Sequence, residues 1–152
     1  LALANRTREA TLNSVIVWGE EYEIGDAQVD AQHRGLIEKI NRLELQLHVT
    51  NPTRRELEFL LQLVADLQVY VDVHFAHEEA CMAQHRCPAA AQNRADHVRL
   101  RSVINNFKAR ADATGFNLEL VRELHALAHD WITAHILGVD QQLRPCLQQC
   151  AD

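Results

Sequence analysis

The sequence predicts an all-α fold, an up-down-up-down antiparallel four-helix bundle. Three observations lead to this prediction: apolar residues recur at three- and four-residue steps in four long segments, strand-like alternation is absent, and short turns join the segments. The composition agrees, because 47% of the 152 residues are hydrophobic and only 5 are Gly and 3 are Pro. We expect one bundle domain over residues 15–143.

The first two helices are predicted on either side of the turn TNPT. The first covers about residues 29–48, and its apolar stripe includes His33. Thr53, with Glu56 three residues later, forms a capping-box pattern that begins the second helix. The apolar stripe of this second helix extends to His74 and Glu78, so both polar residues are expected to face the core.

The last two helices are predicted after the stretch HRCP, which ends the second helix. Pro88 suits the first turn of the third helix, and Gly115 is expected to end that helix. The stripe of the third helix contains Asn93 and His97. Asn117 is predicted to cap the fourth helix, whose stripe reaches His135. The four segments are each expected to span roughly 20–28 residues.

The two ends of the sequence, its charge and its apolar runs limit the classes of partner that we expect. Residues 1–14 are expected to form an N-terminal arm, and residues 144–152 a C-terminal tail that could lead to a further domain. The net charge is −6 with no basic cluster, so nucleic acid is not an expected partner. No apolar run approaches the roughly 20 residues needed to span a bilayer, so membrane insertion is not expected either.

The sequence contains four cysteines, which allow two interpretations of the cellular compartment. They are Cys81, Cys87, Cys146 and Cys150. In a secreted protein they could form two disulfides. Since no signal-peptide pattern precedes them, a reducing, cytoplasmic setting is expected.

Five polar groups lie on the predicted core stripes of all four helices: His33, His74, Glu78, His97 and His135. A single histidine on such a stripe is usually a core residue with one hydrogen-bond partner. Burying several polar groups without partners costs about 1–3 kcal/mol each, and a shared metal ion would satisfy all of them at once. Imidazoles combined with carboxylates favour iron or manganese over structural zinc.

The spacing of these groups supports a shared centre. His74 and Glu78 are four residues apart, on one face of a helix. His135 and Asp140 are five apart, which turns about 140° around an α-helix. This awkward spacing suits two ligands that reach around one centre from the same helix.

With these motifs the chain resembles a bacterial hemerythrin domain. The matching stretches are VDAQH with His33, HFAHEEACM with His74 and Glu78, NRADH with His97, and WITAHILGVD with His135 and Asp140. Together they cover about residues 17–143, nearly the whole chain. The resemblance implies a non-haem di-iron centre that binds O2, with two iron ions (Fe2+/Fe3+) joined by an oxo or hydroxo bridge.

The resemblance also assigns a role to each matching residue. Glu78 and Asp140 would bridge the two irons. The iron with an open position for O2 would be bound by His33 and His74, and the other iron by His97 and His135. An apolar O2 pocket that excludes water would be lined by Leu36, Phe75, Trp131 and Ile132.

Asn93 departs from the family pattern, which places a histidine at this position. The position of Pro88 five residues earlier argues against a misalignment. Three interpretations remain open: Asn93 is a weak oxygen ligand, it hydrogen-bonds a water in the vacant position, or the second iron binds weakly or not at all. His77 is the one other histidine considered as a substitute ligand.

The leading functional hypothesis is an oxygen or redox sensor input domain fused to a signalling domain, and not an enzyme. The alternatives are a free-standing O2 carrier, a weak di-iron oxidase or peroxidase, and a metal-free helical interaction module. Ferritin-like oxidases use paired E-x-x-H motifs, and the chain contains none.

Overall fold

The structure is a computed structural model that describes residues 15–147. The predicted N-terminal arm, and residues 148–152 of the predicted tail with Cys150, lie outside the described residues. Residues 144–147 of that tail form a short helix, α6 (Arg144–Leu147).

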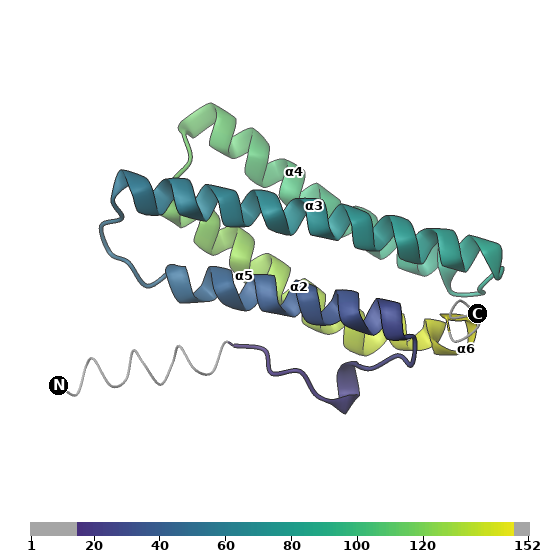
Figure 1. Ribbon diagram of the computed structural model, residues 1–152. Coiled ribbons are helices and arrows are strands. Elements are labelled where there is room, and N and C mark those ends of the chain that lie inside the picture. The colour runs from purple at the N-terminus through teal and green to yellow at the C-terminus, as the bar shows by residue number, and fades with distance from the viewer. Residues whose placement is uncertain (1–14, 148–152) are drawn as a thin grey trace.

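Four long helices form the predicted bundle: α2 (Ala27–Gln46), α3 (Arg54–Gln84), α4 (Ala90–Thr114) and α5 (Leu118–Ala134). Figure 1 shows them side by side, with successive helices running in opposite directions. Helix α2 packs against α3 and α5, and α4 packs against the same two helices, which closes a four-membered ring. The described part of the chain contains no strand. The all-α prediction is therefore confirmed.

Shorter helical segments flank the bundle. A 3-10 turn, η1 (Glu20–Tyr22), precedes α2. Helix α5 continues directly into a π-helical turn, η2 (His135–Val139), and then into a 3-10 turn, η3 (Asp140–Leu143). The chain thus remains helical from α5 through α6, but its hydrogen-bond pattern changes at His135.

Most of the predicted helix ends are confirmed by their caps. Thr53 and Glu56 form the capping box of α3. Gly115 ends α4 with a φ of 86°, in the left-handed region that glycine adopts readily. The side chain of Asn117 accepts a hydrogen bond from the Leu120 N–H at the start of α5. Pro88 differs from the prediction, because it lies in the turn before α4 and not in its first helical turn.

The start of α2 is held by two acidic residues. Asp26 caps the helix by accepting hydrogen bonds from the N–H groups of Gln28 and Val29. Asp30, on the first turn, accepts from the N–H groups of Ile24 and Gly25. The chain that enters α2 is therefore tied to the helix itself, and this fixes the position of His33 one turn later.

Two apolar clusters fill the bundle. The main core cluster extends along all four helices and includes Leu36, Phe75, Leu100 and Ile132. A smaller end cluster lies where α3, the α3–α4 turn and η3 meet; its buried members are Ile24, Val29, Cys81, Met82, Cys87, Ala90 and Leu143.

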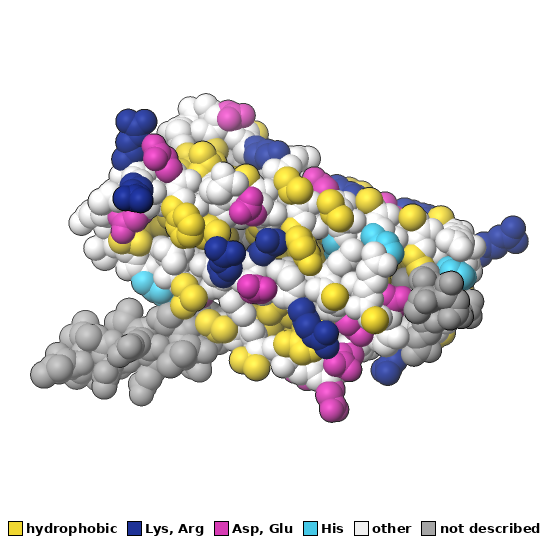
Figure 2. All heavy atoms as spheres, in the orientation of Figure 1, with side chains coloured by type: hydrophobic (Ala, Val, Ile, Leu, Met, Phe, Trp, Pro, Cys, Tyr) yellow, Lys and Arg dark blue, Asp and Glu magenta, His cyan; other side chains and the backbone are white. Residues whose placement is uncertain are grey.

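Helix α3 is long and apolar enough, by length and composition, to cross a membrane. This differs from the prediction that no apolar stretch approaches that length. However, α3 buries His74 and Glu78 inside the bundle, and Figure 2 shows apolar side chains mixed with charged ones on the face it draws. A core helix of a bundle satisfies the same criterion, so length and composition alone do not assign α3 to a membrane.

Candidate metal centre

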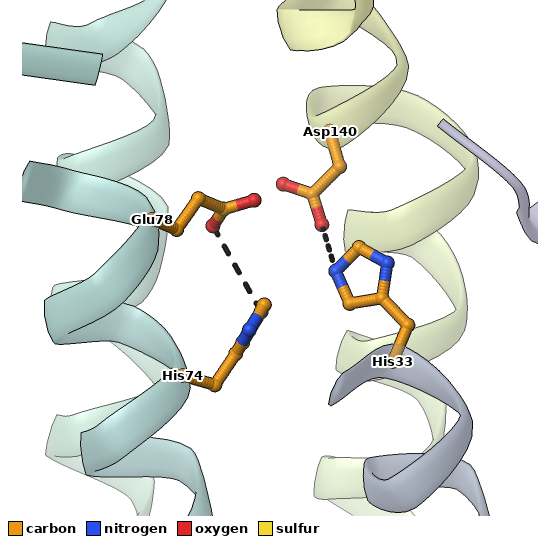
Figure 3. Close-up of side chains that lie close together, drawn as sticks. All are labelled: His33, His74, Glu78 and Asp140. Carbon is orange, nitrogen blue, oxygen red and sulfur yellow. Dashed lines mark ion pairs between the residues drawn. The ribbon is translucent and has the colours of Figure 1, made fainter. Parts of the chain in front are cut away.

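The bundle interior brings together all six residues that were predicted as ligands. They form two groups whose potential ligand atoms lie within 4.8 Å of one another. We call His33, His74, Glu78 and Asp140 group A, and Glu78, His97, His135 and Asp140 group B. Figure 3 shows group A, with Glu78 and His74 projecting from α3 toward His33 of α2 and Asp140. Every member is buried, and both groups share the two carboxylates.

The π-helical turn explains the five-residue spacing between His135 and Asp140. The Asp140 N–H donates to the carbonyl of His135, five residues earlier, where an α-helix would bond four residues earlier. The wider turn brings residues five apart closer to one face of the helix. Both side chains therefore reach the same centre, and the Nε2 of His135 lies 3.0 Å from Oδ1 of Asp140.

Asp140 lies between the two groups and offers one oxygen to each. Its Oδ2 is 3.1 Å from Nε2 of His33 in group A, while its Oδ1 faces His135 in group B. Glu78 is also shared, since its Oε2 lies 3.1 Å from Nε2 of His97 and 3.9 Å from Nε2 of His74. This arrangement is the one expected of two carboxylates that bridge a pair of metal ions.

Several of the buried nitrogen and oxygen atoms that could bind a metal lack any hydrogen-bond partner. Among the described residues these include both ring nitrogens of His33, both oxygens of Glu78, and Oδ2 of Asp140. The Nε2 of His33 lies 3.1 Å from Oδ2 of Asp140, but neither atom has a hydrogen-bond partner. Unsatisfied buried polar groups are costly and rare. A cation coordinated by these atoms would satisfy them, so the residues present fit a metal pair.

Burial keeps two of the imidazoles neutral. It lowers the pKa of His74 well below its usual range, and the neighbouring His33 lowers it further. Burial also lowers the pKa of His97 to about 4, although the hydrogen bond with Glu79 opposes this shift. A metal ligand must be a neutral imidazole with a free lone pair. The side chains of His74 and His97 are in this state at neutral pH.

The two shared carboxylates are perturbed in opposite directions. Burial, and then the nearby Asp140, raise the pKa of Glu78. Burial also disfavours a charge on Asp140, but its contacts with His135 and His33 outweigh that effect and hold its pKa well below the usual range. Two carboxylates at this depth repel one another in the absence of a cation. Their proximity is a further reason to place positive charge between them.

Three residues outside the two groups orient the histidines. The Nδ1 of His97 lies 2.8 Å from Oε1 of Glu79, and the Nδ1 of His135 lies 2.6 Å from Oδ2 of Asp96.

In group A, the Nδ1 of His74 lies 2.9 Å from Oε1 of Gln32. Each acceptor would favour a ring proton on Nδ1 and so make Nε2 of the same ring the potential ligand atom. Gln32, Glu79 and Asp96 were not predicted from the sequence, although each adjoins a predicted ligand.

Asn93 is fully buried beside group B. Its Nδ2 donates a hydrogen bond of 2.8 Å to Oδ1 of Asp140, and its Oδ1 has no partner. His77 belongs to neither group, and its Nδ1 lies 3.5 Å from Nε2 of Gln28. The two groups therefore contain two imidazoles each.

The four residues predicted to line an O2 pocket all lie in or against the main core cluster. The ring of Phe75 stacks on His97, with centroids 3.7 Å apart. The indole of Trp131 stacks on His135 at 4.2 Å and meets Phe75 edge-on. Leu36 and Ile132 are buried in the same cluster. The aromatic side chains thus cover the imidazoles of group B.

Comparison with known proteins gives a consistent result. A family model described as the hemerythrin HHE cation binding domain matches residues 25–147. A bacteriohemerythrin of Methylococcus capsulatus is 30% identical over 118 residues, which cover 78% of this chain and 85% of that protein. A bacteriohemerythrin of Stenotrophomonas maltophilia is 27% identical over 128 residues, covering 84% of this chain and 78% of that protein. A crystal structure of a point mutant is similar with a TM-score of 0.75 at 25% identity, covering 89% of this chain and 98% of that one.

Proposed function

The chain belongs to the hemerythrin HHE cation binding domain family, and from this premise we propose that it holds two iron ions and binds O2. One iron would lie in group A and the other in group B, with Glu78 and Asp140 shared between them. The observation that supports this most strongly is the position of Asp140, which offers one oxygen to His33 and the other to His135.

Iron suits this donor set better than the common alternatives. The centre offers four imidazoles and two carboxylates, a nitrogen–oxygen set that matches iron or manganese. A structural zinc site would have four closed ligands, often thiolates. When bound, two ferrous ions supply the electrons that O2 takes up.

The protein residues would control this chemistry in three ways. Gln32, Glu79 and Asp96 would fix the imidazoles of His74, His97 and His135 with Nε2 toward the metal. Asp140 and Glu78 would neutralise part of the positive charge of the two metal ions, at a depth that bulk water does not reach. The rings of Phe75 and Trp131 would keep water off group B. Exclusion of water and anions favours reversible binding over irreversible oxidation.

We propose that Asn93 is a hydrogen-bond donor to Asp140 and not a ligand. Its amide already donates to the shared carboxylate, and its unpaired Oδ1 could accept a hydrogen bond from a water or an incoming ligand. Group B would then have the same two-histidine, two-carboxylate donor set as group A. Each metal would keep exchangeable positions, which should make the pair easier to oxidise.

Easy oxidation suits an oxygen or redox sensor input domain, fused to a signalling domain, better than an O2 store. A free-standing O2 carrier is the alternative, because the same centre could release O2 intact. Repeated cycles of oxygenation and deoxygenation separate the two. We expect the iron-loaded chain to lose a large part of its O2-linked absorbance change within a few cycles. Full recovery over many cycles would instead favour the carrier.

The same preparation tests for catalysis. Exchangeable positions on both metals could also support slow turnover of peroxide. A steady-state assay with peroxide and a reducing dye would detect this. We expect turnover no faster than that of free ferrous iron, and multiple rapid turnovers per chain would make the protein an enzyme.

A further inference from the structure

Two free thiols lie together at the end of the bundle. Among the described residues the free cysteines are Cys87, which is buried, and Cys146, which is half-buried. Cys87 belongs to the end cluster, and Cys146 of α6 packs against that cluster. The two thiol groups are neighbours, and their interaction is one of the causes that raise the pKa of Cys87, although 58 residues lie between them in the sequence. Cys81, in the same cluster, is disulfide-bonded and so does not compete as a thiol.

The backbone holds Cys87 firmly in place. Its N–H donates to the carbonyl of Met82 at 3.0 Å, and its own carbonyl accepts from the N–H of Ala90 at 3.1 Å. The preceding residue, Arg86, has a φ of 50°, a conformation uncommon outside glycine. This tight turn directs Cys87 into the end cluster, where its thiol meets α6.

The two thiols differ in their access to solvent. Cys146 lines a surface cavity of about 390 Å³ together with Pro88, Gln92 and Gln142, whose side chains are exposed. Cys87 is only 5% exposed, and burial raises its pKa to about 12. A small oxidant in the cavity therefore reaches Cys146 first. Cys87 is buried and remains a protonated thiol at neutral pH.

We propose that Cys87 and Cys146 are a peroxide-responsive dithiol that closes into a disulfide and joins α6 to the α3–α4 turn. In the first step the thiolate of Cys146 attacks one oxygen of hydrogen peroxide. An S–O bond forms, the O–O bond breaks, and the departing hydroxide takes a proton to become water. Cys146 is then a sulfenic acid.

In the second step the sulfur of Cys87 attacks the sulfur of Cys146. The S–S bond forms as the S–O bond breaks, and the hydroxide leaves as a second water with the proton of Cys87. Two thiols have lost two electrons in total, and one peroxide has been reduced to two waters.

The position of this bond gives it a role beyond the thiols. Helix α6 follows η3 and Asp140 directly, and the α3–α4 turn follows the end of α3, which carries Glu78. A disulfide between α6 and the α3–α4 turn would restrict the relative motion of the two segments that follow Asp140 and Glu78 in the sequence. The thiol chemistry itself does not depend on the proposed metal pair.

The test uses the full chain without metal, treated with one equivalent of hydrogen peroxide. Free thiols are counted by alkylation, and peptides are mapped by mass spectrometry without reduction. We expect loss of two free thiols per chain and a cross-linked peptide pair containing Cys87 and Cys146. The Cys146→Ser variant should leave Cys87 as a thiol, and the matched Pro145→Ala variant on the same helix should cross-link like the wild type.

Three results would overturn the proposal: retention of both thiols in the wild type, oxidation of each cysteine to a sulfinic acid without a cross-link, or a new disulfide that joins Cys87 or Cys146 to a third cysteine. The disulfide of Cys81 is present before peroxide is added, so the untreated chain is mapped as the reference. Circular dichroism shows whether the variants are folded. If Cys146→Ser fails to fold, the peptide map of the wild type decides the question alone.

Discussion

Removal of the Asp96 carboxylate should weaken one metal position and leave the other intact. Asp96 lies 2.6 Å from the Nδ1 of His135, a proposed ligand that belongs to group B alone. Group A has no contact of this kind with Asp96. The substitutions Asp96→Asn and Asp96→Ala therefore test whether the two groups bind metal separately.

The size of the effect follows from the contact. A partner that orients a metal-bound histidine is worth about 10–100-fold in metal affinity, or roughly 1.4–2.7 kcal/mol. Asparagine keeps a hydrogen-bond acceptor but loses the charge, and hydrogen bonds to charged groups are about twice as strong as neutral ones. We expect a loss of about tenfold for Asp96→Asn. The loss should approach 100-fold for Asp96→Ala, which leaves the buried Nδ1–H without a partner.

The assay is an anaerobic competition between the iron-loaded chain and a coloured ferrous chelator. In the wild type two irons should be released at high chelator concentration, and in Asp96→Ala one of them should leave at a much lower concentration. Asp130→Asn is the matched control, because Asp130 is highly exposed and belongs to neither group. Equal loss of affinity for both irons, or no change in Asp96→Ala, would refute the proposal that groups A and B each bind one iron separately.

Three further predictions concern single residues. Asn93→His should add a nitrogen donor to group B and make the second iron at least about tenfold harder to remove by the same chelator; an unchanged release curve would mean that Asn93 does not limit that site. Thr53→Ala should lower the unfolding free energy by about 1 kcal/mol in urea without changing iron content, because it removes the side-chain cap of α3; a change in iron content would contradict the separation of cap and site. Burial lowers the pKa of His125, so the unfolded chain binds a proton more readily than the folded chain below about pH 6.5. Stability supplied by this group is therefore complete above that pH and lost as the pH falls through the lowered value. The metal-free wild type should lose more stability than His125→Gln between about pH 7.5 and 5.5, and equal losses would show that His125 does not titrate on unfolding.

The bundle and the burial of five of the six predicted ligands could be predicted from the sequence, because both follow from periodicity. His33, His74 and His97 interrupt apolar stripes at helical spacing, so their burial could be inferred without coordinates. Asp140 was less direct. Its five-residue distance from His135 conflicts with an α-helix, and the π-helical turn that resolves the conflict has no simple sequence signal.

The residues that orient the ligands could not be predicted in the same way. Asp96 precedes His97 in the sequence but contacts His135 on another helix. Gln32 precedes His33 but contacts His74. Such cross-helix contacts depend on how the helices are rotated about their axes, and a stripe pattern fixes that rotation only approximately. The contact between Cys87 and Cys146 depends likewise on where α6, which follows η3 directly, packs against the end cluster.

The number of irons held by each chain tests the central claim most directly. The protein would be loaded with ferrous iron without oxygen, cleared of loosely bound metal, and analysed for iron and protein. Two irons per chain would agree with a pair of groups that share Glu78 and Asp140. One iron or fewer would contradict the shared-carboxylate centre and identify Asn93 as the residue that abolished the second site.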